Sequence, residues 1–85
     1  MTSETTLLTQ REWEVVKCVA QGMRNDEIAK ALYIAQGTVA STLNKVYKKL
    51  GIAANSQFSA RIKLVAMYYK GEIAPSPERK DSDDQ

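Results

Sequence analysis

Apolar residues recur at the spacing of an amphipathic helix in four stretches of the chain, and each stretch is bounded by residues that start or stop helices. This pattern predicts helices over about 10–21, 25–32, 36–50 and 56–70. The periodicity breaks at Tyr33 to Ala35, where Ile34 is expected to pack under a tight turn. Two short helices joined by such a turn form the helix-turn-helix signature. The predicted fold class is therefore all-α, a four-helix helix-turn-helix domain with a long C-terminal helix.

The ends of these helices carry separate signals. Thr9 and Glu12 match a capping box, in which the hydroxyl accepts from the amide of Glu12 and the carboxylate reaches back to the amide of Thr9. Gly22 and Gly51 can take the left-handed conformation that ends a helix. Asn55 is the expected cap of the fourth helix. These signals, rather than the periodicity alone, set the predicted boundaries.

The fourth helix has two apolar faces instead of one. The first consists of Phe58, Ile62, Val65 and Tyr69, and the second of Ala60, Leu64, Met67 and Tyr68. Both faces cannot reach the core of so small a domain. We therefore expect a dimerisation helix, with Leu64, Met67 and Tyr68 at the interface of a homodimer.

A chain of 85 residues has room for one domain. The polar composition of residues 1–6 predicts a flexible N-terminus. Two prolines and a run of charges predict a disordered acidic tail over residues 74–85. The domain itself is expected over residues 7–73.

The composition excludes several kinds of chemistry. The chain contains one cysteine, Cys18, and no histidine, which rules out disulfides, Cys-His zinc sites and imidazole bases. We expect Cys18 to be a small buried apolar residue, and we expect no enzyme activity, metal or cofactor. No apolar run approaches the roughly 18 to 20 residues that span a bilayer, and the N-terminus lacks an export signal. The expected location is the cytoplasm, without a membrane partner.

The formal net charge of +2 conceals an uneven distribution of charge. No acidic residue lies between Glu27 and Glu72, whereas the basic residues there are Lys30, Lys45, Lys48, Lys49, Arg61, Lys63 and Lys70. Acidic residues gather in the tail, at Glu78, Asp81, Asp83 and Asp84. A positive body with a negative tail favours binding to a polyanion, although a merely solvated basic surface has the same composition.

Basic and polar residues share one face of the predicted third helix. With Val39, Leu43, Val46 and Leu50 in the core, the opposite face carries Ser41, Asn44, Lys45 and Lys48, flanked by Thr38 and Lys49. A helix fits the major groove of B-DNA, lysine reaches phosphate oxygens, and serine and asparagine can bond to base edges. The alternative is a lysine-rich solvent face. The pattern favours DNA binding, because the chemistry of this face agrees with the helix-turn-helix geometry.

Four short motifs follow one another at fixed distances. Leu8 to Val16 is similar to L-T-x-R-E-x-E-V-L, and Asn25 to Ala29 resembles N-x-E-I-A. Thr38-Val39 and Lys49 to Ile52 then match T-V and K-L-G-V. Over about residues 8–73 the chain thus resembles the LuxR/FixJ/GerE-type helix-turn-helix DNA-binding domain family, in particular its stand-alone GerE-like members. The resemblance implies a bacterial DNA-binding regulator of transcription whose third helix enters the major groove and whose fourth helix makes the dimer contact.

The resemblance also implies roles for individual residues. Carried over by position, DNA base contacts fall to Ala40, Ser41 and Asn44. DNA backbone contacts fall to Thr38, Lys45, Lys48 and Lys49. The implied partners are double-stranded DNA and a second copy of the chain, and RNA polymerase or a larger LuxR-type regulator are further candidates.

Four positions depart from the family pattern. Ala40 stands where lysine is usual, and Ala35 where a serine hydroxyl caps the third helix. Asp26 replaces a common basic residue and Asn55 an arginine. We therefore expect weaker phosphate anchoring and a binding sequence different from the usual one.

Two alternative functions share these features. Bacterial sigma factors bind promoters through a helix-turn-helix that often ends G-T-V-x-S, as Gly37 to Ser41 do here, but they generally lack a substantial fourth helix. A non-DNA-binding interaction protein, which pairs with and inhibits a full-length family member, would also fit Ala40 and Asp26. Since family members usually carry a further domain, the chain is expected to be either a stand-alone regulator or part of a longer one.

Overall fold

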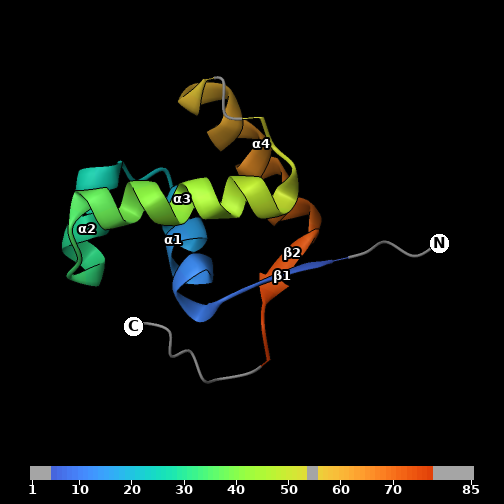
Figure 1. Ribbon diagram of the computed structural model, residues 1–85, viewed down its shortest axis with the longest axis horizontal. Coiled ribbons are helices and arrows are strands. Elements are labelled where there is room, and N and C mark those ends of the chain that lie inside the picture. Colours follow the sequence, from blue (N-terminus) through green and yellow to red (C-terminus); the bar gives the residue numbers. More distant parts are fainter. Residues whose placement is uncertain (1–4, 54–55, 78–85) are drawn as a thin grey trace.

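The computed structural model describes residues 5–53 and 56–77 of the chain. In chain order its elements are β1 (Thr6–Leu8), α1 (Gln10–Ala20), α2 (Asn25–Leu32), α3 (Gln36–Leu50), α4 (Gln57–Lys70) and β2 (Ile73–Pro75) (Figure 1). The described residues thus form four helices and one small pair of strands, which confirms the predicted all-α fold class. The helix boundaries agree with the predicted ones to within about one residue.

Helix α1 is the centre of the packing. It contacts the other three helices and both strands. In Figure 1, α3 crosses in front of α1, with α2 near the amino end of α3 and α4 above its carboxyl-terminal half. The core collects apolar side chains from all of these elements: Leu8, Val15, Val16, Val19, Ile28, Ala29, Val39, Leu43, Val46, Tyr47, Ala60, Leu64 and Ile73. Each helix therefore buries one face, as its amphipathic spacing requires.

The predicted capping box at the start of α1 is present. Thr9 Oγ1 accepts from the amide of Glu12 at 3.1 Å, and Glu12 Oε1 accepts from the amide of Thr9 at 2.9 Å. Gly22, just after α1, and Gly51, at the end of α3, both have positive φ and end helices as predicted. Helix α3 begins without a side-chain cap, because Ala35 has no hydroxyl.

The turn between α2 and α3 consists of Tyr33 to Ala35. Ile34 packs against the core, and its amide donates to the carbonyl of Ala29 at 3.0 Å, so it is the plug that the sequence predicted. Tyr33 takes the left-handed conformation, with φ 59°. The turn thereby joins α2 and α3 as a helix-turn-helix.

The pairing of β1 with β2 was not predicted. The two strands are parallel, with Thr6 opposite Ile73 and Leu8 opposite Pro75. The pairing is stabilised because Leu8 and Ile73 are both buried, a requirement that neither three-residue segment reveals alone. The boundaries expected at residues 7 and 73 are therefore wrong: Thr6 and Ala74–Pro75 belong to the folded domain. The rest of the expected tail, residues 78–85, lies outside the described residues, as do residues 1–4.

Helix α4 begins one residue later than predicted, with Ser56 as its N-cap. Ser56 Oγ accepts from the amide of Ser59 at 3.4 Å. Asn55, the cap that the sequence suggested, lies outside the described residues. The N-cap is therefore Ser56 rather than the predicted Asn55, and both residue types have a side-chain oxygen that can accept from amides of the first turn.

The two apolar faces of α4 are assigned the opposite way from the prediction. Ala60 and Leu64 are fully buried, whereas Phe58, Ile62 and Tyr69 are exposed. Leu64 as a dimer contact is therefore wrong, because a side chain with 0% exposure offers no surface to a partner. We attribute the choice of face to Ala60, whose small side chain lets α4 lie close against α1.

The other two predicted dimer residues, Met67 and Tyr68, are half-buried and pack against the core. The ring of Tyr68 lies 5.3 Å from that of Trp13 on α1, measured between ring centroids. This aromatic contact holds the carboxyl-terminal half of α4 to α1. Both residues therefore take part in packing within the chain.

Candidate nucleic-acid interface

Helix α3 separates a buried face from an exposed polar face. Its buried residues are Val39, Thr42, Leu43, Val46 and Tyr47. The exposed residues include all seven of the predicted DNA contacts, Thr38, Ala40, Ser41, Asn44, Lys45, Lys48 and Lys49. The structure thus brings the predicted site residues together on the surface of one helix.

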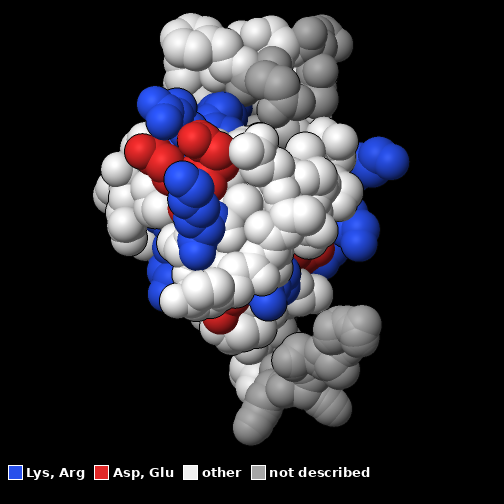
Figure 2. Space-filling model, turned by 90° about the vertical axis from the view of Figure 1, so that its left-hand side faces the viewer, with Lys and Arg blue, Asp and Glu red and all other residues white. Residues whose placement is uncertain are grey.

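Two lysines of this face are not neutralised. Within residues 5–53 and 56–77, no carboxylate lies within ion-pair distance of Lys45 or Lys48. Figure 2 views the molecule from the end that carries α2, and a basic side chain at its right-hand edge stands apart from any acidic one. Unpaired ammonium groups on an exposed helix are available to an anionic partner.

Lys49 differs from these two lysines. Its Nζ donates to Oε1 of Glu12 at 2.7 Å, and the Glu12 side chain is almost completely buried. The same Oε1 atom caps α1 by accepting from the amide of Thr9. Lys49 therefore ties the carboxyl end of α3 to the amino end of α1, a role that the sequence analysis missed because the partners are 37 residues apart.

The start of α2 carries a small cluster of opposite charges. Arg24 Nε donates to Oδ1 of Asp26 at 3.2 Å, and the backbone amide of Arg24 donates to Oε1 of Glu27 at 2.8 Å. The hydrogen bond from Arg24 lowers the pKa of the Asp26 carboxyl below its usual value. Asp26 therefore stays ionised and offsets the charge of Arg24, so this corner attracts phosphate less than a free arginine would.

The polar groups of the α3 face differ in their availability. Ser41 Oγ donates to the carbonyl of Thr38 at 3.3 Å, which leaves the hydroxyl oxygen free to accept. No described residue hydrogen-bonds to the exposed side-chain amide of Asn44. Asn44 can therefore offer a donor and an acceptor at once, the pattern that reads an adenine edge.

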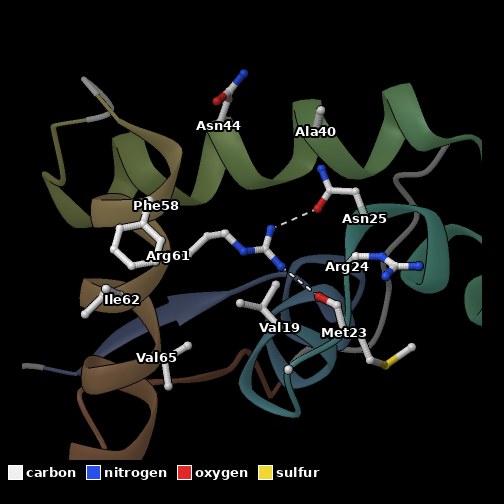
Figure 3. Close-up of a pocket in the computed structure, with 11 residues that line it drawn as sticks. Val19, Met23, Arg24, Asn25, Ala40, Asn44, Phe58, Arg61, Ile62 and Val65 are labelled. Carbon is white, nitrogen blue, oxygen red and sulfur yellow. Dashed lines mark hydrogen bonds between the residues drawn. The ribbon is translucent and has the colours of Figure 1, made fainter.

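A groove of about 840 Å³ lies beside this face. Ala40 and Asn44 of α3 form one wall, the α1–α2 turn forms another, and Phe58, Ile62 and Val65 of α4 form the third (Figure 3). The wall from α4 is therefore apolar, apart from Arg61, which also lines the groove. The exposed surfaces of α3 and α4 are continuous here.

Arg61 fixes the geometry of this groove. From α4 its side chain reaches towards the α1–α2 turn (Figure 3), where Nη1 donates to Asn25 Oδ1 at 2.9 Å and Nη2 donates to the Met23 carbonyl at 2.7 Å. Arg61 thereby joins α4 to the beginning of α2. The sequence analysis counted Arg61 only as part of the basic block, because no local pattern marks a partner 36 residues away.

Other kinds of site find little support among the described residues. They contain no group of three or more His, Cys, Asp or Glu side chains that could hold a metal ion. Cys18 is half-buried against the core, and its burial raises the pKa of the thiol above its ordinary value, which disfavours the reactive thiolate form. No helix in the described ranges is long and apolar enough to cross a membrane.

Comparison with known proteins connects this geometry to a family. The sequence model of the family described as bacterial regulatory proteins, luxR family, matches residues 6–61. The HTH-type transcriptional regulator MalT of Yersinia pestis (strain Pestoides F) is 43% identical over 49 residues, and so are the MalT proteins of Yersinia pseudotuberculosis (serotype O:1b) and Yersinia enterocolitica (serotype O:8). These matches cover 58% of the chain but only 5% of each relative.

Proposed function

Because the chain belongs to the luxR family of bacterial regulatory proteins, we propose that it regulates transcription by inserting α3 into the major groove of a specific duplex DNA sequence. The observation that carries this proposal is the exposed face of α3, on which Lys45 and Lys48 have no acidic partner among the described residues. An α-helix with its side chains is about 10–12 Å wide, which matches the roughly 12 Å of the B-DNA major groove.

Within this proposal the residues of α3 have different roles. Lys45 and Lys48 contact phosphates, and the Thr38 hydroxyl contacts the DNA backbone beside them. Ser41 and Asn44 hydrogen-bond to base edges, and Ala40 offers only a methyl group, which suits contact with a thymine methyl. Lys49 reaches a phosphate only by leaving Glu12, so we expect it to contribute least.

We assign dimerisation to the outer stripe of α4, which consists of Phe58, Ile62, Val65 and Tyr69. Three of these side chains, Phe58, Ile62 and Tyr69, are more than half exposed, and two of the three are aromatic rings. If a second copy packed its own outer stripe against this one, both stripes would be buried and the interface would have two-fold symmetry. Two copies of α3 would then face two half-sites on the DNA.

The test measures binding to duplex DNA by fluorescence anisotropy at salt concentrations between about 50 and 200 mM. Lys45→Ala and Lys48→Ala should each weaken binding to every sequence and flatten the plot of log K against log salt by about 0.9, since each removes one phosphate contact. Lys17→Ala is the charge-matched control, because Lys17 is exposed on α1 away from α3, and it should leave the slope unchanged.

Asn44→Ala tests base readout in the same assay. It should keep the salt slope and lower the preference for the selected sequence over random DNA by about 1 to 3 kcal/mol per half-site. Equal salt slopes in the wild type and both lysine variants would contradict the placement of α3. Absence of duplex binding at low salt would favour instead the interaction protein that pairs with a larger family member.

A further inference from the structure

Tyr33 is the most exposed large hydrophobic residue described. Its side chain is 93% accessible, and its backbone has φ 59° and ψ 46°. It is the only non-glycine residue with positive φ in residues 5–53 and 56–77. Glycine takes the positive φ at the ends of the other helices, at Gly51 and Gly71 directly after α3 and α4 and at Gly22 two residues after α1. At the end of α2 alone, the chain places a bulky aromatic residue where glycine suits the backbone better.

Within the described residues, the Tyr33 side chain makes no contact that would offset the strain of its backbone conformation. Left-handed backbone is strained for a residue with a Cβ atom and unstrained for glycine. No hydrogen bond or ring contact joins the Tyr33 side chain to another described residue. The next residue, Ile34, packs against the core and so keeps Tyr33 pointing outward. Strained and exposed side chains of this kind are found where a site needs them, which directs attention to what Tyr33 could contact outside the chain.

The position of Tyr33 suggests the partner. It stands three residues before Gln36, the first residue of α3, in the turn that leads into the proposed recognition helix. When a helix fills the major groove, the segment at its amino end meets the phosphates that border the groove. A tyrosine hydroxyl is a good donor to a phosphate oxygen, and the aromatic ring holds it at a fixed reach with few rotatable bonds.

We propose that Tyr33 is a DNA contact, whose hydroxyl donates to a phosphate at the edge of the groove that α3 enters. This inference rests on the proposed function. It adds to the proposed contacts a residue that is neither basic nor part of the family motifs quoted above. The contact is neutral on the protein side. It therefore adds affinity without releasing a counterion, so its loss lowers the affinity for DNA by the same factor at every salt concentration.

The test uses two substitutions at the same position. Tyr33→Gly removes the strain together with the hydroxyl, so its melting temperature should rise while its affinity for duplex DNA falls about tenfold. Tyr33→Phe keeps the ring and the backbone strain but lacks the hydroxyl. It should melt like the wild type and show a similar loss of affinity. In both variants the slope of log K against log salt should equal that of the wild type.

Leu7→Ala is the control, since Leu7 is an exposed large side chain on β1, far from α2 along the molecule (Figure 1). It should leave DNA affinity unchanged. Wild-type affinity in both Tyr33 variants, or a loss confined to Tyr33→Gly, would overturn the hydroxyl contact. The proposed function fails separately, through the absence of duplex binding by the wild type or wild-type behaviour of Lys45→Ala and Lys48→Ala.

Discussion

The Tyr47 hydroxyl is the one side-chain polar atom of the described residues that is buried without a hydrogen-bond partner. Burial raises the pKa of this phenol above its ordinary value of 10.0, and nearby Arg61 offsets only part of the effect. By contrast, Glu12 satisfies its buried carboxylate twice, with the Thr9 amide and Lys49. Single residues in this protein therefore contribute to stability with opposite signs, according to whether their polar atoms find partners.

Tyr47→Phe should stabilise the protein by about 1 kcal/mol, because it removes an unpaired buried hydroxyl and keeps the packing of the ring. It should also reduce sensitivity to alkali. The folded pKa lies above the unfolded one, so the stability linked to Tyr47 is complete below pH 10.0 and is lost as the pH rises further.

Urea denaturation near pH 7 and above pH 10.0 measures both effects. Tyr68→Phe serves as the control, because Tyr68 is half-buried and its hydroxyl is not among the buried atoms that lack partners. A lower midpoint for Tyr47→Phe at neutral pH would mean that the hydroxyl does have a partner in solution.

Helix α4 contributes to two different surfaces of the protein. Its Ala60–Leu64 side packs against α1, and Arg61 binds the α1–α2 turn. On its outer stripe, Phe58, Ile62 and Val65 line the groove beside α3. Because the groove includes Ala40 and Asn44, a partner seated on the outer stripe would lie next to the proposed DNA contacts.

Opposite consequences are expected for charges on the two sides of α4. Phe58→Asp and Ile62→Asp should keep the helical content and separate a dimer into monomers, since both side chains are exposed. Leu64→Asp should unfold the domain, because burying an unpaired carboxylate costs roughly 4 kcal/mol or more, a large share of a small domain's stability.

Circular dichroism and sedimentation mass at micromolar concentrations distinguish these outcomes. Lys63→Ala provides an exposed control on the same helix that lies outside the stripe. If Phe58→Asp and Ile62→Asp leave a dimeric mass unchanged, the outer stripe is not the interface.

In the whole molecule, the pairing of β1 with β2 brings the two ends of the domain together (Figure 1). The amide of Thr6 donates to the backbone carbonyl of Glu72 at 3.0 Å, and the amide of Ser76 donates to the Leu8 carbonyl at 2.8 Å. The chain after Gly71 is therefore part of the fold up to Ser76. Residues 78–85 carry four acidic and two basic side chains, so without them the formal net charge would change from +2 to +4.

Two truncations separate these contributions. A chain that ends at Pro77 should melt like the full chain and bind duplex DNA more tightly at low salt, because acids that compete with phosphates are gone. A chain that ends at Gly71 should lose roughly 2 kcal/mol or more of stability, because it lacks the buried Ile73 side chain and the strand pairing. Equal melting temperatures of the two truncated chains would contradict the role of β2.

The sequence by itself determined the four helices, the helix-turn-helix and the exposed face of α3. Capping boxes, glycine stops and amphipathic spacing act over about four residues, so a single stretch of chain contains the whole signal. Even Ser41 and Asn44 could be placed on the surface in this way, because one period fixes all positions of one helix.

The tertiary structure alone decided which apolar face of α4 is buried, how β1 finds β2, and that Lys49 pairs with Glu12. Two apolar faces of one helix have the same hydrophobic period, and the packing of α4 against α1 buries the one that carries Ala60 and Leu64. The ion pair and the Arg61 bonds join residues 36 to 38 positions apart. Such contacts depend on how the helices pack together, which local spacing along the chain does not specify.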